Sequence, residues 1–250
     1  MNIANMVPQS LEEAIAEAII FTKQALADGR TRLQVELVIP EIALQAQALG
    51  LEFTSLFQDY GAGLKVIFPD TGAAALARRD WGETDFRISD LGSRYIPVDQ
   101  KISDEDQAFL LVSPSSVEVQ SVEKLCNLAG DRPVVLLIPQ LEDVSIVGIG
   151  YAARALRERF LKTLETSYYF RPLEGAVVLR AYPSLWQVHL ENENGYELIA
   201  EVPEKPLGEA LENLILEKTA PITANGEEIV KAKKSGLFAS MNRFLKALNQ

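Results

Sequence analysis

Four short apolar segments of this chain are each followed closely by a proline, and no other feature constrains its fold as strongly. The prolines are Pro40, Pro69, Pro114 and Pro139. The segments before them are rich in valine, isoleucine and leucine, which is typical of buried strands. Proline cannot donate a hydrogen bond to a β-ladder, so it terminates a strand. The pattern therefore predicts four buried strands with a proline at each carboxyl end.

Helical patterns separate most of these strands. Ser10 and Glu13 form a capping box ahead of an apolar repeat, which predicts a helix over residues 11–27 that ends at Asp28-Gly29. Further helices are predicted over residues 42–59, 70–78, 117–129, 151–169 and 206–217. Alternating strands and helices are typical of a mostly parallel sheet that helices cover on both faces. We therefore predict an α/β fold with a mostly parallel, Rossmann-like sheet.

The pattern changes in the C-terminal third of the chain. Three alternating segments at residues 176–182, 186–190 and 196–202 are joined by tight turns, one of which is the hairpin signal Glu193-Asn194-Gly195. They predict an antiparallel C-terminal meander that continues the same sheet, within a single α/β domain over residues 8–218. Shorter candidate strands lie at residues 86–88 and 95–98.

Charge and residue inventory exclude several functions. The chain has 24 Lys and Arg against 35 Asp and Glu, a net charge of −11, so its surface repels phosphate backbones and we expect no nucleic acid partner. One cysteine and one histidine leave no zinc site, no internal disulfide and little to catalyse with. Cys126 occupies an apolar helix position and is expected to pack in the core. His189, on the same strand face as Gln187, is expected to face solvent or to be hydrogen-bonded.

One edge of the predicted sheet carries a candidate ligand pocket. Ligands of open parallel sheets bind at the carboxyl ends of the strands, where helix N-termini suit an anion. The candidate residues there are Asp70, Thr71, Gly72, Ser113, Ser115 and Ser116. The same residue types also cap helices, so capping alone is the alternative. These loops contain no Lys or Arg and no P-loop pattern, and we expect no cofactor.

Two further motifs have simpler explanations than a binding site. The segment Gly148–Ala153 matches the dinucleotide template G-x-G-x-x-A, but it lies late in the chain and the acid that follows, Glu165, is expected inside a helix. We therefore interpret the glycines as a loop. The acidic turn Asp104–Asp106 suggests either a divalent cation site or, more simply, a solvated turn.

The last twenty residues differ from the rest of the chain. They carry five basic residues and no acid, which leaves 19 basic against 35 acidic residues, a net charge of −16, on the first 230. After a linker over residues 219–234, an apolar stripe at helical spacing predicts an amphipathic helix over residues 235–250. The expected membrane-binding or partner-binding residues are Lys231, Lys233, Lys234, Leu237, Phe238, Met241, Arg243, Phe244, Leu245, Lys246 and Leu248. Docking of this helix on the chain's own core is the alternative.

Several strand-end motifs together resemble a known family. They are Val35–Pro40, Val66–Asp70, Leu111–Pro114, Pro133–Pro139, Tyr168–Pro172 and Leu179–Trp186. With them the chain resembles a domain of unknown function shared by cyanobacteria and chloroplasts, which includes plant low photosystem II accumulation type proteins and the C-terminal extension of a chloroplast adenylate kinase. The family has no established catalytic residues. The resemblance implies a photosynthetic cell and the stromal or cytoplasmic side of thylakoids, while the lack of a Walker-type loop argues against a kinase.

These observations lead to two functional hypotheses. The first is a non-enzymatic assembly or regulatory factor that binds a protein partner, such as a photosystem assembly component, and contacts an anionic membrane surface through its C-terminal helix. The alternative is a small-ligand (anion or nucleotide) binding module or enzyme that uses the loops after the parallel strands. The acidic N-terminus, with Glu12, Glu13 and Glu17, predicts no secretory signal, so a cytoplasmic protein, peripheral on the thylakoid, is expected.

Overall fold

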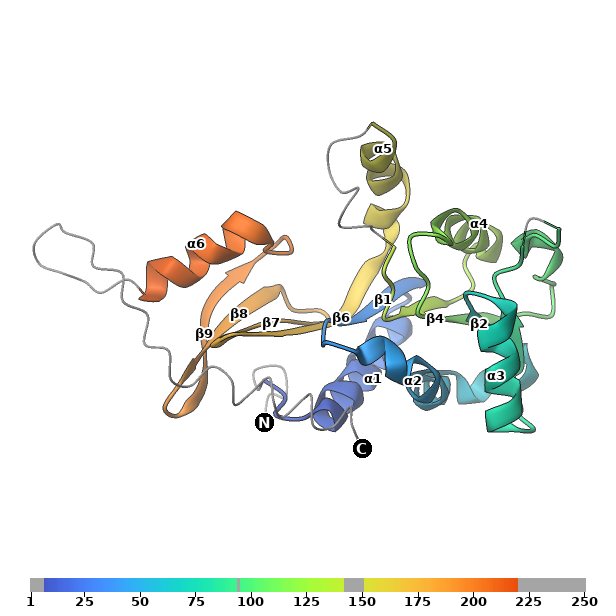
Figure 1. Ribbon diagram of the computed structural model, residues 1–250, viewed down its shortest axis with the longest axis horizontal. Helices are drawn as coiled ribbons and strands as arrows, with labels where there is room; N and C mark the ends of the chain where they lie inside the picture. The colour runs from blue at the N-terminus through green and yellow to red at the C-terminus, as the bar shows by residue number, and fades with distance from the viewer. Residues whose placement is uncertain (1–6, 94, 142–150, 220–250) are drawn as a thin grey trace, which may run out of the picture.

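The computed structural model describes residues 7–93, 95–141 and 151–219, and within them it shows one nine-stranded mixed sheet (Figure 1). The strand order is β3-β2-β4-β5-β1-β6-β7-β8-β9. The strands from β3 to β6 pair in parallel, and those from β6 to β9 pair antiparallel. The predicted fold class, a mostly parallel sheet with an antiparallel C-terminal meander, is confirmed.

Most elements follow in the order that the sequence suggested, and the exceptions are described below. The helices are α1 (Leu11–Ala27), α2 (Ala46–Phe53), α3 (Thr71–Trp81), α4 (Val119–Ala129), α5 (Tyr151–Arg159) and α6 (Gly208–Thr219). The strands are β1 (Arg32–Leu37), β2 (Leu64–Phe68), β3 (Arg87–Asp90), β4 (Ala108–Val112), β5 (Val134–Leu137), β6 (Glu165–Leu173), β7 (Ala176–Ala181), β8 (Trp186–Asn192) and β9 (Gly195–Val202). Short 3₁₀ segments are η2 (Ile42–Gln45), η3 (Thr54–Gly63), η4 (Val98–Gln100) and η5 (Leu161–Thr163).

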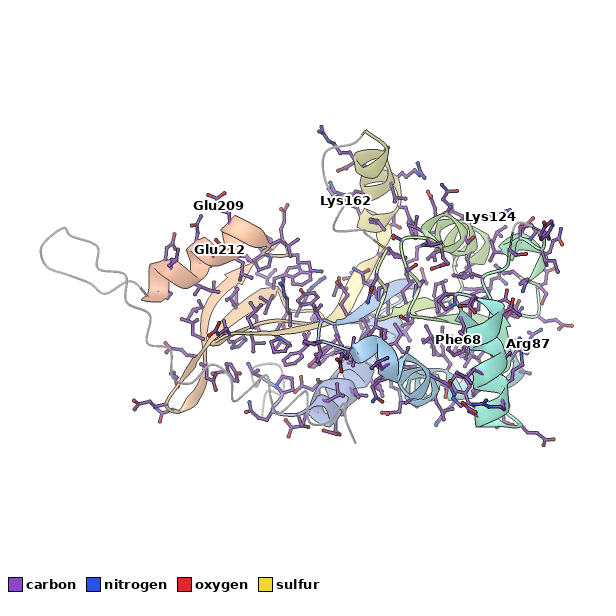
Figure 2. All side chains as sticks on the ribbon, in the orientation of Figure 1. Phe68, Arg87, Lys124, Lys162, Glu209 and Glu212 are labelled. Atoms are coloured by element: carbon purple, nitrogen blue, oxygen red, sulfur yellow. The ribbon has the colours of Figure 1, made fainter. Side chains whose placement is uncertain are left out.

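Helices cover both faces of the sheet. In Figure 1, α1, α2 and α3 lie below it, whereas α4, α5 and α6 lie above it. Every residue of β2, β4 and β5 is buried, which is why their sequences are apolar runs rather than alternating ones, with Lys65 of β2 as the one exception. Phe68, for example, lies inside, 5.6 Å from the Trp81 ring of α3, whereas Glu209 and Glu212 project outward from α6 (Figure 2).

Local capping signals place two helix starts where the sequence predicted them. The Ser10 hydroxyl accepts a hydrogen bond from the Glu13 amide at 3.2 Å, at the start of α1. The Asp70 carboxylate accepts one from the Ala73 amide at 3.0 Å, at the start of α3. These contacts satisfy amides that a helix N-terminus leaves without a partner in the helix itself.

The predicted helix over residues 42–59 is shorter than expected. Its α-helical part is α2 alone, between the 3₁₀ segments η2 and η3. The Thr54 hydroxyl donates to the Leu51 carbonyl at 2.7 Å, so it competes for an acceptor that a continuing α-helix would use. Phe57, which is buried, has a non-helical φ of −123°. The prediction of one long helix was therefore wrong.

The predicted helix over residues 151–169 was wrong in its second half. Its first half is α5, but β6 begins at Glu165 and enters the sheet between β1 and β7. Within β6, Tyr168 and Phe170 belong to the core below the sheet and Tyr169 to the core above it, the period of two that a strand requires. Tertiary pairing thus decides the structure of this segment.

The two short candidate strands had different outcomes. The segment predicted at residues 86–88 is β3, an edge strand parallel to β2. The segment predicted at 95–98 contains no strand in its described residues, and η4 begins at its last residue. There the chain turns tightly at Gly92, with φ of +90°, and a Cβ at this position would lie 2.4 Å from the Ile96 carbonyl oxygen.

Candidate functional site

The first half of the predicted ligand pocket lies at the N-terminus of α3. Asp70 caps this helix, and Gly72 follows in its first turn. The Thr71 hydroxyl donates to Asp90 Oδ2 at 3.3 Å, at the end of the neighbouring β3. Lys101 forms an ion pair with Asp90, so a cation does reach this edge of the sheet. Lys101 was not predicted to lie here, because it follows η4, in a stretch of the sequence without a regular apolar pattern.

Asp90 itself is a buried charge with several partners. It also accepts a hydrogen bond from the Gly92 amide at 2.8 Å. Burial alone would raise the pKa of Asp90, but the hydrogen bonds from Lys101 and Gly92 outweigh burial and lower it. The carboxylate is thus charged and paired within the chain.

The second half of the predicted pocket is a hydrogen-bonded turn just before α4. The Ser115 hydroxyl and amide both donate to Glu118 Oε2, at 2.6 and 2.9 Å, and the Val117 amide donates to the Ser115 hydroxyl at 3.2 Å. Ser113 and Ser116 are partly buried beside it. The predicted capping box therefore does not cap the helix: α4 begins two residues later than predicted, and its N-cap, Glu118, makes no side-chain capping contact.

Three non-glycine residues of the described chain have a left-handed φ, and all three follow the carboxyl ends of adjacent strands. They are Glu41 at +62°, Ser113 at +51° and Ile138 at +45°, after β1, β4 and β5. For a β-branched residue such as Ile138 this conformation is strained. Strained backbone of this kind clusters at ligand sites, which is the strongest structural support for a pocket here.

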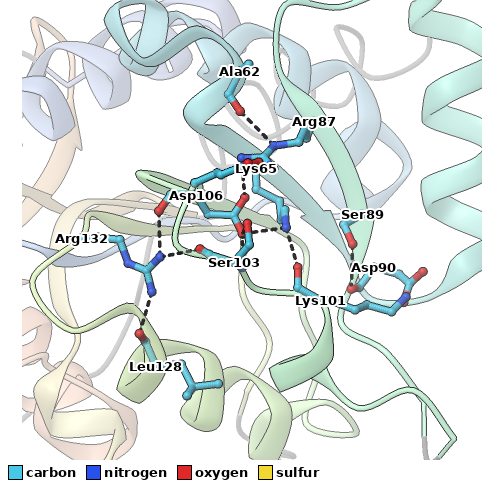
Figure 3. A network of polar contacts seen from close by, with 11 residues as sticks. Ala62, Lys65, Arg87, Ser89, Asp90, Lys101, Ser103, Asp106, Leu128 and Arg132 are labelled. Carbon is cyan, nitrogen blue, oxygen red and sulfur yellow. Dashed lines mark hydrogen bonds and ion pairs between the residues drawn. The ribbon is translucent and has the colours of Figure 1, made fainter.

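A buried charge network lies at the opposite edge of the sheet, where β2 and β4 begin (Figure 3). Asp106 is fully buried, with Oδ2 2.7 Å from Lys65 Nζ and Oδ1 2.9 Å from a guanidinium nitrogen of Arg87. Arg132 donates to the Ser103 and Asp106 carbonyls at 3.0 and 2.8 Å.

This network revises the interpretation of the acidic turn. Asp106 is neither solvated nor directed at a metal ion, since two cations of the chain already hold it. Across the described ranges, no group of three or more potential metal ligands is found. The network fixes the loop before β4, and its role is structural.

The one cysteine and the one histidine of the chain, Cys126 and His189, are both buried. Burial raises the pKa of the Cys126 thiol to about 12, and the side chain packs against α4's neighbours in the core, as predicted. His189 is only 1% exposed, so the expectation that it faces solvent was wrong. The hydrogen-bonded alternative is confirmed, because its Nε2 lies 3.4 Å from Gln187 Oε1. Burial lowers the pKa of His189, which therefore stays neutral.

An open cavity of about 300 Å³ lies between α1 and α2, and the sequence analysis did not identify it. We call it the α1–α2 groove. It is lined by Leu11, Glu12, Ile15, Ala16, Ile19, Gln45, Ala48, Leu49 and Glu52. Leu44, next to Gln45 in η2, is 79% exposed, and Leu51 of α2 is also exposed. The spacing of Leu44, Ala48 and Leu51 is that of an apolar stripe on a helix. This stripe is hard to recognise in the sequence, because a second stripe of apolar, buried residues runs beside it.

Two acids, Glu12 and Glu52, line the groove and are close enough to interact electrostatically. The pKa of Glu52 is raised, mainly by its burial and to a smaller extent by the charge of Glu12. No ion pair found among the described residues involves either carboxylate. An apolar floor between two acids suits an amphipathic helix that carries basic residues.

Two other predictions rest on residues outside those that the structure describes. These are the glycines of the dinucleotide-like segment and the C-terminal segment, whose candidate residues run from Lys231 to Leu248. Glu165, the acid once expected inside a helix, begins β6 and lies 3.4 Å from Arg30. In the described chain no helix has both the length and the apolar character needed to span a membrane.

Comparison with protein families gives one finding. A family model with the description "Domain of unknown function (DUF1995)" matches residues 8–213. The match begins just before α1 and ends within α6, so it takes in the whole nine-stranded sheet. Its description names no activity, ligand or partner.

Proposed function

We propose that this chain, which belongs to the DUF1995 family, a domain of unknown function, is a non-enzymatic assembly or regulatory factor. It acts by protein–protein interaction at the thylakoid surface of a photosynthetic cell. The observation that carries this proposal is the α1–α2 groove, with its apolar floor, its two acids and the exposed Leu44 beside it. Exposed apolar surface rimmed by polar residues is typical of sites that bind a partner.

Outside the groove, the polar side chains that catalysis could use are already paired within the chain or buried. This supports a binding role over a catalytic one. Asp70 caps α3, Ser115 is hydrogen-bonded to Glu118, and Asp90 is paired with Lys101. Cys126 and His189 are buried, and the thiol has a pKa of about 12, so neither offers a reactive group at neutral pH.

The photosynthetic setting is supported by the strand-end motifs that resemble cyanobacterial and chloroplast proteins. Within that setting the partner is a photosystem assembly component, and the basic C-terminal residues contact an anionic membrane surface. Each basic residue near such a surface contributes about 1 kcal/mol, so five of them suffice for weak, salt-sensitive binding.

Copurification from thylakoid extracts tests the proposal. The test variant is full-length Leu44→Glu with Ala48→Glu, which adds acids to the groove. The matched control is Leu128→Glu, an exposed leucine of α4 on the other face of the sheet. We expect copurifying proteins to be lost from the test variant and retained by the control. Equal recovery with both variants would contradict the proposed role of the groove.

The alternative function is a ligand-binding module or enzyme at the carboxyl edge. The specific observation in its favour is the left-handed backbone at Ser113 and Ile138, at the same edge of the sheet as the Asp90–Lys101 pair. Thermal-shift measurements with nucleotides and phosphorylated metabolites distinguish the two. A saturable stabilisation that Asp70→Ala or Ser115→Ala abolishes would favour this alternative.

A further inference from the structure

The chain segments that form the α1–α2 groove carry charge of one sign only. They are residues 7–22, which include most of α1, and residues 41–63, which run from just before η2 to the end of η3. Together they contain six acids and no Lys or Arg, and the acids are Glu12, Glu13, Glu17, Glu41, Glu52 and Asp59. All of these except Glu17 are exposed. Such a surface repels anionic partners and attracts cationic ones.

The surface between these acids is apolar. Ile15 and Ile19 line the groove from α1, and Ala48 lines it from α2. Two large apolar side chains lie exposed beside it, Leu44 at 79% and Ile20 at 50%. An apolar patch of this kind, bordered by charged residues, is typical of a surface that another protein covers.

We propose that the α1–α2 groove binds a short basic amphipathic helix of a partner protein. The apolar side chains of that helix lie on the groove, and a Lys or Arg lies close to both Glu12 and Glu52. The inference rests on the proposed function, since it names the chemical class of partner that the groove takes. The two carboxylates are close enough to interact, because the charge of Glu12 contributes to the raised pKa of Glu52. A cation beside them replaces this repulsion with attraction.

The size of the groove sets the length of the helix. Its lining covers residues 11–19 of α1 and 45–52 of η2 and α2, about 12 and 10 Å of helix axis. Two turns of a partner helix therefore fit, with apolar side chains at i, i+4 and i+7 as the anchors. A third helix can pack here because side chains three and four residues apart on α1 and α2 form ridges, between which its own side chains fit.

Other kinds of occupant fit less well. An anionic membrane surface and a phosphorylated ligand meet the same repulsion from the acids. An extended peptide would need a free strand edge, but α1 and α2 lie over β1, β4, β6 and β7, each of which has a paired strand on both sides. A second copy of the chain, in a symmetric dimer, would bring one acidic groove against another.

Selection from a peptide display library tests the inference. The library presents random peptides of about twelve residues, or three helical turns, and is panned against the full-length chain. We expect the enriched peptides to carry a net positive charge and to have apolar residues at helical spacing. Their affinity should fall about tenfold for Ala48→Trp, which fills the groove, and stay unchanged for the control Ala210→Trp. Ala210 is exposed on α6, on the other face of the sheet (Figure 1).

Charge reversal tests the electrostatic part separately. Glu12→Lys with Glu52→Lys is expected to abolish binding of the selected peptides and to allow binding of synthetic versions whose Lys and Arg are replaced by Glu. The matched control is Glu209→Lys with Glu212→Lys, which changes the net charge equally on the outward side of α6 (Figure 2). It should leave the affinity, measured by fluorescence anisotropy, within about twofold, because charges far from the groove are screened.

The thermal midpoint of each variant shows whether the fold is retained. If the reversed pair lowers it, Glu12→Gln with Glu52→Gln takes its place, and a smaller loss of peptide affinity is expected.

The inference is overturned if no peptides are enriched, if the enriched peptides are acidic or uncharged, if their affinity is the same for Ala48→Trp as for Ala210→Trp, or if charge reversal acts no more strongly than its control. Loss of copurifying proteins from Leu44→Glu with Ala48→Glu, combined with any of these results, leaves the proposed function standing and removes only the inference. Basic peptides that bind the groove, combined with unchanged copurification, contradict the proposed function instead.

Discussion

The parallel half of the sheet and the antiparallel meander are built on different principles. In the parallel half, helices lie above and below, and β2, β4 and β5 have every residue buried. In the meander, β9 has no buried residue; among the described helices, α6 covers one face, and on the other face α1 reaches β7. The cluster under α6 has five buried residues, Tyr169, Val178, Trp186, Val188 and Leu211.

This difference follows from how the two kinds of sheet are connected. Parallel strands need crossover helices, which cover both faces, whereas antiparallel hairpins leave a face free. The core of this protein therefore lies mainly in the parallel half. The α1–α2 groove lies in the helix layer of that same half, on a rigid support. Substitutions of equal chemistry should cost more in this half than in the meander.

The largest expected effect is at the buried charge of the parallel half. Asp106→Ala leaves the buried Lys65 without its carboxylate and removes one of the two carboxylate partners of Arg87, and we expect the free energy of unfolding to fall by about 3–5 kcal/mol. Urea denaturation measures it. The control is Asp104→Ala, an exposed neighbour, for which a change within about 0.5 kcal/mol is expected. Similar losses for both would show that the network contributes little.

A matched pair of leucine truncations tests the comparison directly. Leu136→Ala removes a fully buried side chain from β5, and we expect a loss in unfolding free energy in the upper part of the range of about 2–5 kcal/mol. Leu211→Ala, in the small cluster under α6, is expected to cost about 2 kcal/mol or less, because α6 can shift to fill the space. A larger loss at Leu211 would reverse our assignment of the main core.

A pH-dependent effect is expected where α1 packs on β6, the strand that joins the two halves. Burial raises the pKa of Glu17 to about 7, and the hydrogen bond from the Tyr168 hydroxyl, at 2.9 Å, offsets burial only in part. Between pH 4.5 and 7 the folded chain holds a proton that the unfolded chain has lost, so stability falls as the pH rises through this window.

Glu17→Gln removes this titration. We expect the variant and the natural chain to be equally stable near pH 4.5, and the variant to be more stable at pH 8. The gain at pH 8 should be about 1–2 kcal/mol, because water reaches part of the carboxyl and reduces the cost of its charge. Thermal unfolding at both pH values measures the difference. A variant that is less stable at pH 8 would mean that the charged carboxylate is favourable in this position.

The smallest expected effect is at the contact between β1 and the loop before α6. Lys205 Nζ lies 2.6 Å from Glu36 Oε2 and 4.2 Å from the centre of the Tyr169 ring. Lys205→Met keeps the apolar stem and removes the charge, so a loss of about 1 kcal/mol or less is expected. It should shrink further in 1 M salt. A loss that matches Asp106→Ala would mean that the meander depends on this pair.

Signals carried by a few consecutive residues were predictable from the sequence. The prolines marked the ends of β1, β2, β4 and β5, and Ser10 and Asp70 marked helix starts. The hairpin turn before Gly195 lies where it was expected. These features depend on backbone sterics and hydrogen bonds within one turn, so the local sequence determines them. The buried, unreactive state of Cys126 followed in the same way from its apolar position in a helix.

Features that depend on distant partners were decided only by the tertiary structure. Residues 165–169 have a helical pattern but form a strand, because β1 and β7 supply ladder partners on both sides. The pairing of Asp90 with Lys101, and of Asp106 with Lys65 and Arg87, joins segments whose loops gave no local signal. The α1–α2 groove exists because two helices meet over one sheet face. Such contacts form only when the chain has folded, so no short stretch of sequence encodes them.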